Sequence, residues 1–361
     1  FRIRFQLTCQ GYCHSICSMY ARWFLKISRF SLLLLSLLLA ASSSAERPEE
    51  KARMNTICEA DDRNPDEGYP VGRVYYNDRK EAICTAWIAP NGWLVTAGHC
   101  NSGYYKFDEI QFQVPESNCS GEVQVPEDRH RYRVDLSSIK SRVDLGATQD
   151  WALFQITPHP TFGMPGPFGE GSFFRISNRK LDRQAESVIR NTGFGVELRV
   201  FEGCKKRNRT MQSSLGKAYN SPGYLIHFLD THMGSSGSPL YEEASNALYV
   251  MGTHRGGGCP NIATSVLNPG FLKALNDVTG RPTVYVDWMG PRTGPSNGGI
   301  EAPFRNLNKA LEKVKSGGDI NIVPGNYRTA NLKIPNRPLR IRAPFGSVSI
   351  GQQDANSAGD N

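Results

Sequence analysis

The middle of the chain alternates between short hydrophobic runs and clusters of glycine, proline, asparagine and aspartate. Runs of this kind, rich in valine, isoleucine and aromatic residues and bounded by turn residues, are typical of β-strands. A series of so many short strands predicts an all-β barrel or sandwich, closed by a short helix at Leu272–Val278. The predicted strands are Val71–Tyr76, Ile83–Ile88, Trp93–Thr96, Ile110–Val114, Trp151–Ile156, Ser187–Ile189, Leu198–Phe201, Tyr224–Phe228, Leu248–Gly252 and Ala263–Val266.

The pattern changes after Pro282. Phe304, Leu307, Leu311 and Val314 recur at the spacing of one helix face. We therefore predict a main domain over residues 69–280 and a β-rich tail with one helix over residues 283–351. The tail's predicted strands are Thr283–Asp287, Ile320–Val323, Leu332–Ile334, Leu339–Ile341 and Val348–Ile350.

The start of the chain has the layout of a secretory signal. Basic residues follow Met19, a leucine-rich run spans residues 31–41, and small residues end at Ala45. The apolar run is shorter than the roughly 20 residues that a membrane span needs, so an N-terminal anchor helix is the less favoured alternative. After removal of the signal we expect no membrane association, and a secreted or extracellular protein, with the periplasm as the other compartment. We interpret residues 1–18 as outside the natural coding sequence, 19–45 as the signal peptide and 46–68 as a disordered or processed leader.

The net charge is distributed unevenly. The whole chain of 361 residues has a formal charge of +8, but residues 46–280 hold 26 Lys and Arg against 28 Asp and Glu. The predicted main domain is thus near neutral, and nucleic acid is not an expected partner. The basic run at residues 205–209 is expected to be a solvated loop.

Six cysteines remain if the three that precede Met19 are removed. An even count in a secreted chain favours disulfides, and the absence of any closely spaced cysteine pair argues against a zinc site. We expect neither a metal nor a cofactor. The six cysteines are Cys58, Cys84, Cys100, Cys119, Cys204 and Cys259.

Three segments carry the residue types that nucleophilic acyl transfer needs. They are Thr96-Ala-Gly-His-Cys100, Asp150-Trp-Ala-Leu153 and Gly234-Ser-Ser-Gly-Ser-Pro239. A serine hydroxyl needs an imidazole to take its proton and a carboxylate to orient that imidazole. These roles fall to Ser236, His99 and Asp150, because glycines flank Ser236 and an apolar strand follows Asp150. Ser235, Ser238, Asp135 and Asp144 are the rival hydroxyls and carboxylates.

The segments, in the order His, Asp, Ser, resemble those of the trypsin-like (chymotrypsin-fold) serine proteases over residues 69–280. The resemblance implies two six-stranded β-barrels, and a Cys84–Cys100 disulfide that holds His99 on its loop. It also implies an oxyanion hole formed by the backbone N–H groups of Gly234 and Ser236. For the other four cysteines, pairing Cys259 with Cys204 and Cys58 with Cys119 is one of three arrangements that remain open.

Position 235 departs from the digestive and clotting enzymes of that family. Those enzymes carry an aspartate there, which pairs with a newly cut N-terminus, and Ser235 cannot form that ion pair. The segment instead resembles the glutamyl-endopeptidase branch, in which a threonine and a histidine at the positions of Thr231 and His254 bind an acidic substrate side chain. The alternative is that His254 is only a strand histidine lining the cleft. His227 and His232 are expected to be structural or exposed.

The tail resembles the opening of the right-handed parallel β-helix (pectin-lyase-like) proteins, in which an amphipathic helix caps the first coil. The resemblance rests on Tyr285-Val-Asp287, Pro303-Phe-Arg-Asn-Leu307, Gly317-Gly-Asp319 and Val323-Pro-Gly-Asn-Tyr327. The tail is then either a cap-like remnant or the start of a longer solenoid.

These observations favour a secreted serine endopeptidase that acts on proteins or peptides, with a preference for Glu before the scissile bond. The alternative is an inactive extracellular binding protein on a protease fold, whose tail contacts carbohydrate or a cell surface. A polysaccharide-active enzyme ranks lowest, because the tail's acidic residues form no recognisable catalytic pair. Those residues are Asp287, Glu301, Glu312 and Asp319.

Overall fold

The computed structural model describes residues 56–58, 60–101, 107–144, 148–166, 172–184, 187–328 and 332–351. The predicted signal peptide, the residues before it and the first part of the predicted leader lie outside this set. Within it, neither α-helix is long and apolar enough to span a membrane.

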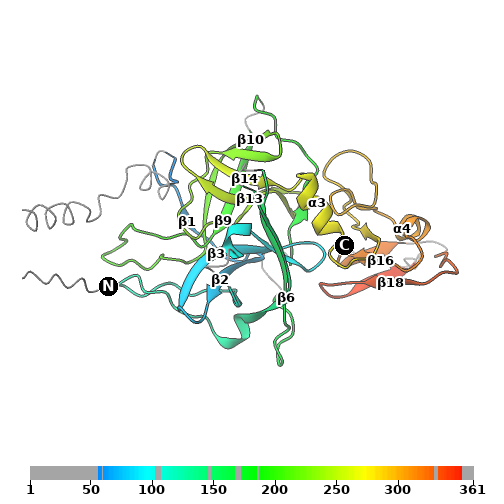
Figure 1. The fold of residues 1–361 in the computed structure, drawn as a ribbon, viewed down its shortest axis with the longest axis horizontal. Coiled ribbons are helices and arrows are strands. Elements are labelled where there is room, and N and C mark those ends of the chain that lie inside the picture. The colour runs from blue at the N-terminus through cyan, green and yellow to red at the C-terminus, as the bar shows by residue number, and fades with distance from the viewer. Residues whose placement is uncertain are drawn as a thin grey trace, which may run out of the picture. The chain divides into compact units, whose positions relative to one another are not determined.

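The first half of the described chain forms a closed antiparallel barrel. Its six strands follow one another around the barrel in the order β2 (Val71–Tyr76), β3 (Glu81–Ile88), β4 (Leu94–Thr96), β7 (Asp150–Ile156), β6 (Arg131–Val143) and β5 (Glu109–Gln111). Val74, Ile110 and Phe154 fill its interior and are fully buried. Closure leaves none of these strands with an unpaired edge. Figure 1 shows β2 and β3 in blue to cyan and β6 in green.

The second half forms another closed antiparallel ring of six strands. The order is β9 (Val188–Gly193), β10 (Gln212–Ser221), β11 (Tyr224–His227), β14 (Asn261–Ser265), β13 (Ala247–Gly257) and β12 (Pro239–Ala244), and β12 pairs again with β9. Two short strands are added outside the ring. β1 (Asn64–Pro65) pairs with β10, and β8 (Arg175–Ile176) pairs in parallel with β13. The predicted all-β architecture of two six-stranded barrels is therefore confirmed.

The two barrels share one core. Trp87 of the first barrel packs edge-on against Phe174, which in turn packs against Tyr241 of the second barrel. Helix α3 (Pro269–Asn276) covers this core and brings Phe271 against Trp151. Its N-terminus is capped by Asn268, whose side-chain oxygen accepts the N–H groups of residues 270 and 271.

Residues 46–68 were expected to be a leader, but the structure places residues 56–58 and 60–68 of it against the second barrel. Cys58 forms a disulfide with Cys259, and β1 pairs with β10. The low hydrophobicity of this segment favoured a disordered leader, but polar contacts and the disulfide hold it instead.

Three disulfides join cysteines in the described part of the chain: Cys84–Cys100, Cys58–Cys259 and Cys119–Cys204. The first is the bridge that the resemblance implied. The pairing singled out for the other four cysteines is wrong, because Cys58 bonds to Cys259 and Cys119 bonds to Cys204. Sequence spacing carried no information on which of the three arrangements forms.

The tail contains β15 (Thr283–Val286), α4 (Leu307–Lys313), β16 (Gly318–Ile322), β17 (Gly325–Arg328), β18 (Leu339–Arg342) and β19 (Val348–Gly351). Its strands pair in parallel, as β15–β16–β18 and β17–β19, and α4 packs on them (Figure 1). The predicted strand Leu332–Ile334 does not form, and Ile334 is largely exposed. The resemblance of this tail to a β-helix stays a prediction.

Candidate active site

His99 lies in a 3₁₀ turn, Gly98–Asn101, directly after β4. The Cys84–Cys100 disulfide ties this turn to β3. The imidazole is 39% exposed, so one face of it is open to solvent and to a ligand. The sequence places a reactive ring on a turn that two neighbouring strands and a covalent bond hold in place.

Asp150 begins β7 and is almost completely buried. Its two carboxylate oxygens bind His99 twice: one lies 2.7 Å from the ring Nδ1, and the other accepts the backbone N–H at 2.8 Å. Thr264 of the second barrel exchanges hydrogen bonds with the Asp150 backbone, which fixes the strand start. Burial alone would raise the pKa of Asp150, but the hydrogen bonds and charge of His99 and the charge of Arg255 hold that pKa below its ordinary value.

Ser236 lies in the turn that precedes β12. Gly234 and Gly237 in this turn have φ angles of +100° and +88°, which side chains other than glycine rarely adopt. The turn is docked on the first barrel, because the backbone N–H of Thr85 donates to the Ser236 carbonyl at 2.8 Å. The Cys100 sulfur lies 3.9 Å from the same oxygen. Ser236 is thus brought against the segment that carries His99.

The Ser236 hydroxyl is oriented differently from the expected triad. It donates to the carbonyl oxygen of Arg255 at 3.4 Å, and not to His99. The backbone N–H of Ser235 donates to His232 within the loop. Among the described residues, no hydrogen bond uses the N–H groups of Gly234 and Ser236, the two donors expected to form the oxyanion hole.

The two residues expected to bind an acidic side chain make separate contacts. The Thr231 hydroxyl is fully buried and lies 2.6 Å from the hydroxyl of Thr56. The ring of His254 is buried, with Nδ1 3.1 Å from Nε2 of His227. Burial, together with the charge of His99, lowers the pKa of His254 to about 3, so the ring is neutral near pH 7.

Two residues at this site, Arg255 and Asp230, were not singled out from the sequence. The Arg255 Nε lies 3.3 Å from the Asp150 carboxylate, and Asp230 accepts the backbone N–H groups of Cys58 and Asp62. His227, expected to be structural or exposed, is buried against His254. Only Arg255 had a signal in the sequence, since it directly follows His254.

The rival residues are occupied elsewhere. Asp144 pairs with Arg142, Asp135 binds the hydroxyl of Ser137, and the buried Ser238 accepts from Asn191. Cys84, His99 and Cys100 bring three atoms of metal-ligating types within 4.8 Å of one another. Both cysteines are joined in the disulfide, so neither offers a thiolate, and the group does not suit a metal ion.

No protein-family model matches the chain. The chain is 28% identical over 203 residues to the secreted RxLR effector protein 73 of Plasmopara viticola. The match covers 55% of this chain and 46% of that protein, so the chain spans about half the length of the relative. A solved structure of a Glu endopeptidase in complex with MPD is 15% identical, has a TM-score of 0.44, and covers 63% of this chain and all of its own.

Proposed function

We propose that the protein is a secreted serine endopeptidase with Ser236 as nucleophile. The observation that carries this proposal is the pair of His99 and the buried Asp150, joined at 2.7 Å, with the Ser236 turn docked beside it. A buried carboxylate that binds both the ring and the backbone of one histidine fixes the tautomer that leaves Nε2 free to accept a proton.

The reaction follows from these groups. Rotation about its Cα–Cβ bond takes the Ser236 hydroxyl from Arg255 to His99, which accepts its proton as Oγ attacks the peptide carbonyl. The backbone N–H groups of Gly234 and Ser236 stabilise the negative oxygen of the tetrahedral intermediate. The carbon–nitrogen bond then breaks, and the leaving amine takes the proton from His99. Water hydrolyses the remaining ester in the same way and restores Ser236.

A fluorophosphonate probe tests the nucleophile directly. We expect it to label the folded wild-type protein on Ser236, and Ser236→Ala to abolish the labelling. Ser137→Ala, which removes an exposed hydroxyl on β6, is the control and should be labelled like the wild type.

A preference for Glu before the scissile bond is the finer part of the proposal. It is supported by His254, whose backbone bonds to the residues that follow Ser236 and whose neutral imidazole can donate an N–H to a carboxylate. The Thr231 hydroxyl would have to leave its bond with Thr56 to take part. Because His254 is neutral, affinity for the carboxylate would come from hydrogen bonding and not from an ion pair. Profiling with a peptide library is the test, and equal cleavage after Glu and Ala would contradict the preference.

The second candidate function is that of an inactive extracellular binding protein. Two observations favour it: the Ser236 hydroxyl binds Arg255 and not His99, and the similar protein in Plasmopara viticola is named an effector. In that case the tail, with the half-exposed ring of Trp288, is the candidate surface for carbohydrate or for another cell-surface ligand. A folded wild-type protein that the probe does not label would favour this function.

A further inference from the structure

The loop formed by residues 230–236 carries both proposed oxyanion donors and the nucleophile, yet it has no carboxylate at position 235 to hold it. The Ser235 hydroxyl is used inside the loop, where it accepts the N–H of His232 at 3.2 Å. Some other part of the molecule must therefore fix the loop. Contacts with the loop identify it as the segment made of residues 56–58 and 60–63.

The segment binds the first residues of the loop through Asp230 and Thr231. The Asp230 carboxylate accepts the N–H groups of Cys58 at 2.6 Å and Asp62 at 2.8 Å. Thr231 and Thr56 pair through their backbones, and the Thr56 hydroxyl donates to the Thr231 carbonyl at 2.6 Å. These bonds fix the loop where it leaves β11.

The same segment reaches the other side of the loop through Arg63. Arg63 donates from Nη1 to the Val196 carbonyl at 2.8 Å, and the Val196 N–H donates to the Met233 carbonyl at 2.9 Å. Met233 directly precedes Gly234, so this chain of bonds ends at the first oxyanion donor. Arg209 donates to the same Met233 oxygen and supports it from a third side.

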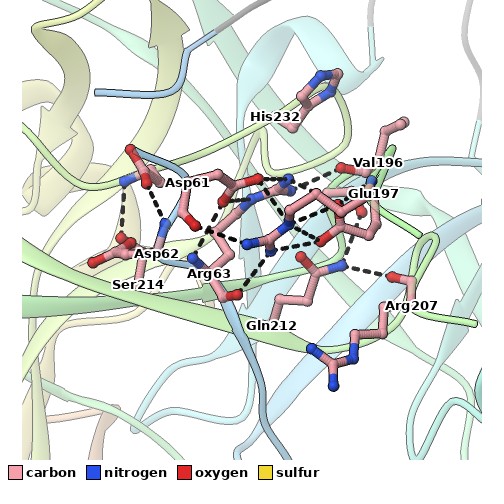
Figure 2. Close-up of polar contacts among 12 residues, drawn as sticks. Asp61, Asp62, Arg63, Val196, Glu197, Arg207, Gln212, Ser214 and His232 are labelled. Atoms are coloured by element: carbon pink, nitrogen blue, oxygen red, sulfur yellow. Dashed lines mark hydrogen bonds and ion pairs between the residues drawn. The ribbon is translucent and has the colours of Figure 1, made fainter. Parts of the chain in front are cut away.

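The guanidinium of Arg63 is itself held by a partly buried group of charges. Figure 2 shows Asp61, Arg63 and Glu197 converging beside Val196, with dashed lines joining them. The Asp61 carboxylate lies 2.8 Å from the Arg63 guanidinium. The fully buried Glu197 lies 3.8 Å from Arg63 and 2.7 Å from Arg199. The side chain of Arg63 is 4% exposed. Its Nε and Nη2 donate to the Asp61 carboxylate, and its Nη1 donates to the Val196 carbonyl. Such a network stays in one arrangement because breaking any pair leaves a charge buried without its partner.

We propose that residues 56–58 and 60–63 position the oxyanion loop, with Asp230 and Arg63 as the positioning residues, in place of the ion pair that Ser235 cannot form. The Cys58–Cys259 disulfide keeps the segment attached to the barrel. This inference rests on the proposed function for its consequence in catalysis, but the positioning itself can be measured without catalysis.

Hydrogen–deuterium exchange in the full protein is the primary test. We expect the amides of residues 230–237 to exchange about tenfold faster in Arg63→Gln and Asp230→Asn than in the wild type. Arg175→Gln is the matched control, since it breaks a part-buried pair with Asp287 that does not touch the loop. Thr56→Val keeps the shape of the side chain and removes only the hydroxyl, so it gives a folded variant if the charge variants unfold.

Catalysis gives the second readout. Labelling of Ser236 and kcat should fall about tenfold in Arg63→Gln, with KM changed less than twofold, because Arg63 supports the oxyanion donors and touches no substrate. Arg63→Lys, which still donates to Val196, should recover part of the loss. Loop exchange equal to the wild type in Arg63→Gln and Thr56→Val would overturn this inference. An ordered loop in a wild-type protein that is not labelled would contradict the proposed function alone.

Discussion

At the scale of single residues, the buried His254 should make stability depend on pH. Its pKa falls from 6.5 to about 3 on folding, so between these values the unfolded chain binds more protons than the folded protein. The free energy of unfolding therefore rises with pH in this window, by at most about 1.4 kcal/mol per pH unit. As the pH falls through the window, this contribution to stability disappears. His254→Asn should have a shallower slope than the wild type in urea unfolding between pH 4.5 and 7. Equal slopes would contradict the burial of a neutral ring.

Asp150 acts in a different window, which keeps the two effects apart. Its pKa lies below its ordinary value in the folded protein, so its contribution to stability is present above about pH 4 and is lost as pH falls further. Asp230 also titrates between pH 4.5 and 7, because burial raises its pKa to about 6, and its contribution to the slope has the opposite sign. The difference in slope between the wild type and His254→Asn therefore isolates the histidine. His227, whose pKa burial also lowers, contributes with the same sign as His254.

At the scale of elements, the Ser236 turn fits its place only because Gly237 has no side chain. A Cβ there would lie 2.1 Å from the Thr85 carbonyl, at a φ of +88°. Gly203 has a φ of +78° with no atom near the added Cβ, so it isolates the cost of the backbone conformation. We expect Gly203→Ala to lower the free energy of unfolding by about 1 kcal/mol, and Gly237→Ala by about 3 kcal/mol or more with loss of probe labelling. Urea unfolding of the two variants is the measurement, and similar losses would argue against the docked turn.

Elements with apolar side chains were predictable from the sequence, and elements built on polar side chains were not. Val71–Tyr76 was predicted with its correct bounds, whereas β10 was missed because its buried residues include Gln212, Ser213 and Ser214. The converse error is Leu198–Phe201, which is apolar enough for a strand but has no neighbour to pair with beyond a single bridge at Phe201. Whether β10 and Leu198–Phe201 form strands depends on pairing with neighbouring strands, and the local sequence pattern holds no information on that pairing.

The candidate site shows the same division. His99 and Asp150 were predicted as partners from their motifs, and the structure places them in contact. The contacts of Thr56, Asp230 and Arg255 join segments far apart in the chain, and no local motif predicts them. Contacts between segments that are distant in the sequence are therefore found only once the fold is known.

At the scale of the whole described molecule, the tail and the barrels share a core, which predicts that they unfold together. Tyr285 of the tail is 3% exposed and belongs to the same cluster as Trp87 and Trp151. Phe345 stacks on Phe173 with ring centres 4.8 Å apart. Removing the Tyr285 ring leaves a cavity against the barrels, which costs about 3 to 5 kcal/mol for a buried aromatic side chain.

We therefore expect Tyr285→Ala to lower the midpoint of denaturant unfolding reported by the buried tryptophans of the barrels, in a Trp288→Phe background that removes the tail's own tryptophan. Ile350→Ala, at a partly exposed position on β19, is the control and should shift the midpoint by much less. If the tail were an independent unit, Tyr285→Ala would leave the midpoint of the barrels unchanged. A shift in a single cooperative transition would instead mean that substitutions in the tail act on the stability of the barrels that carry His99 and Ser236.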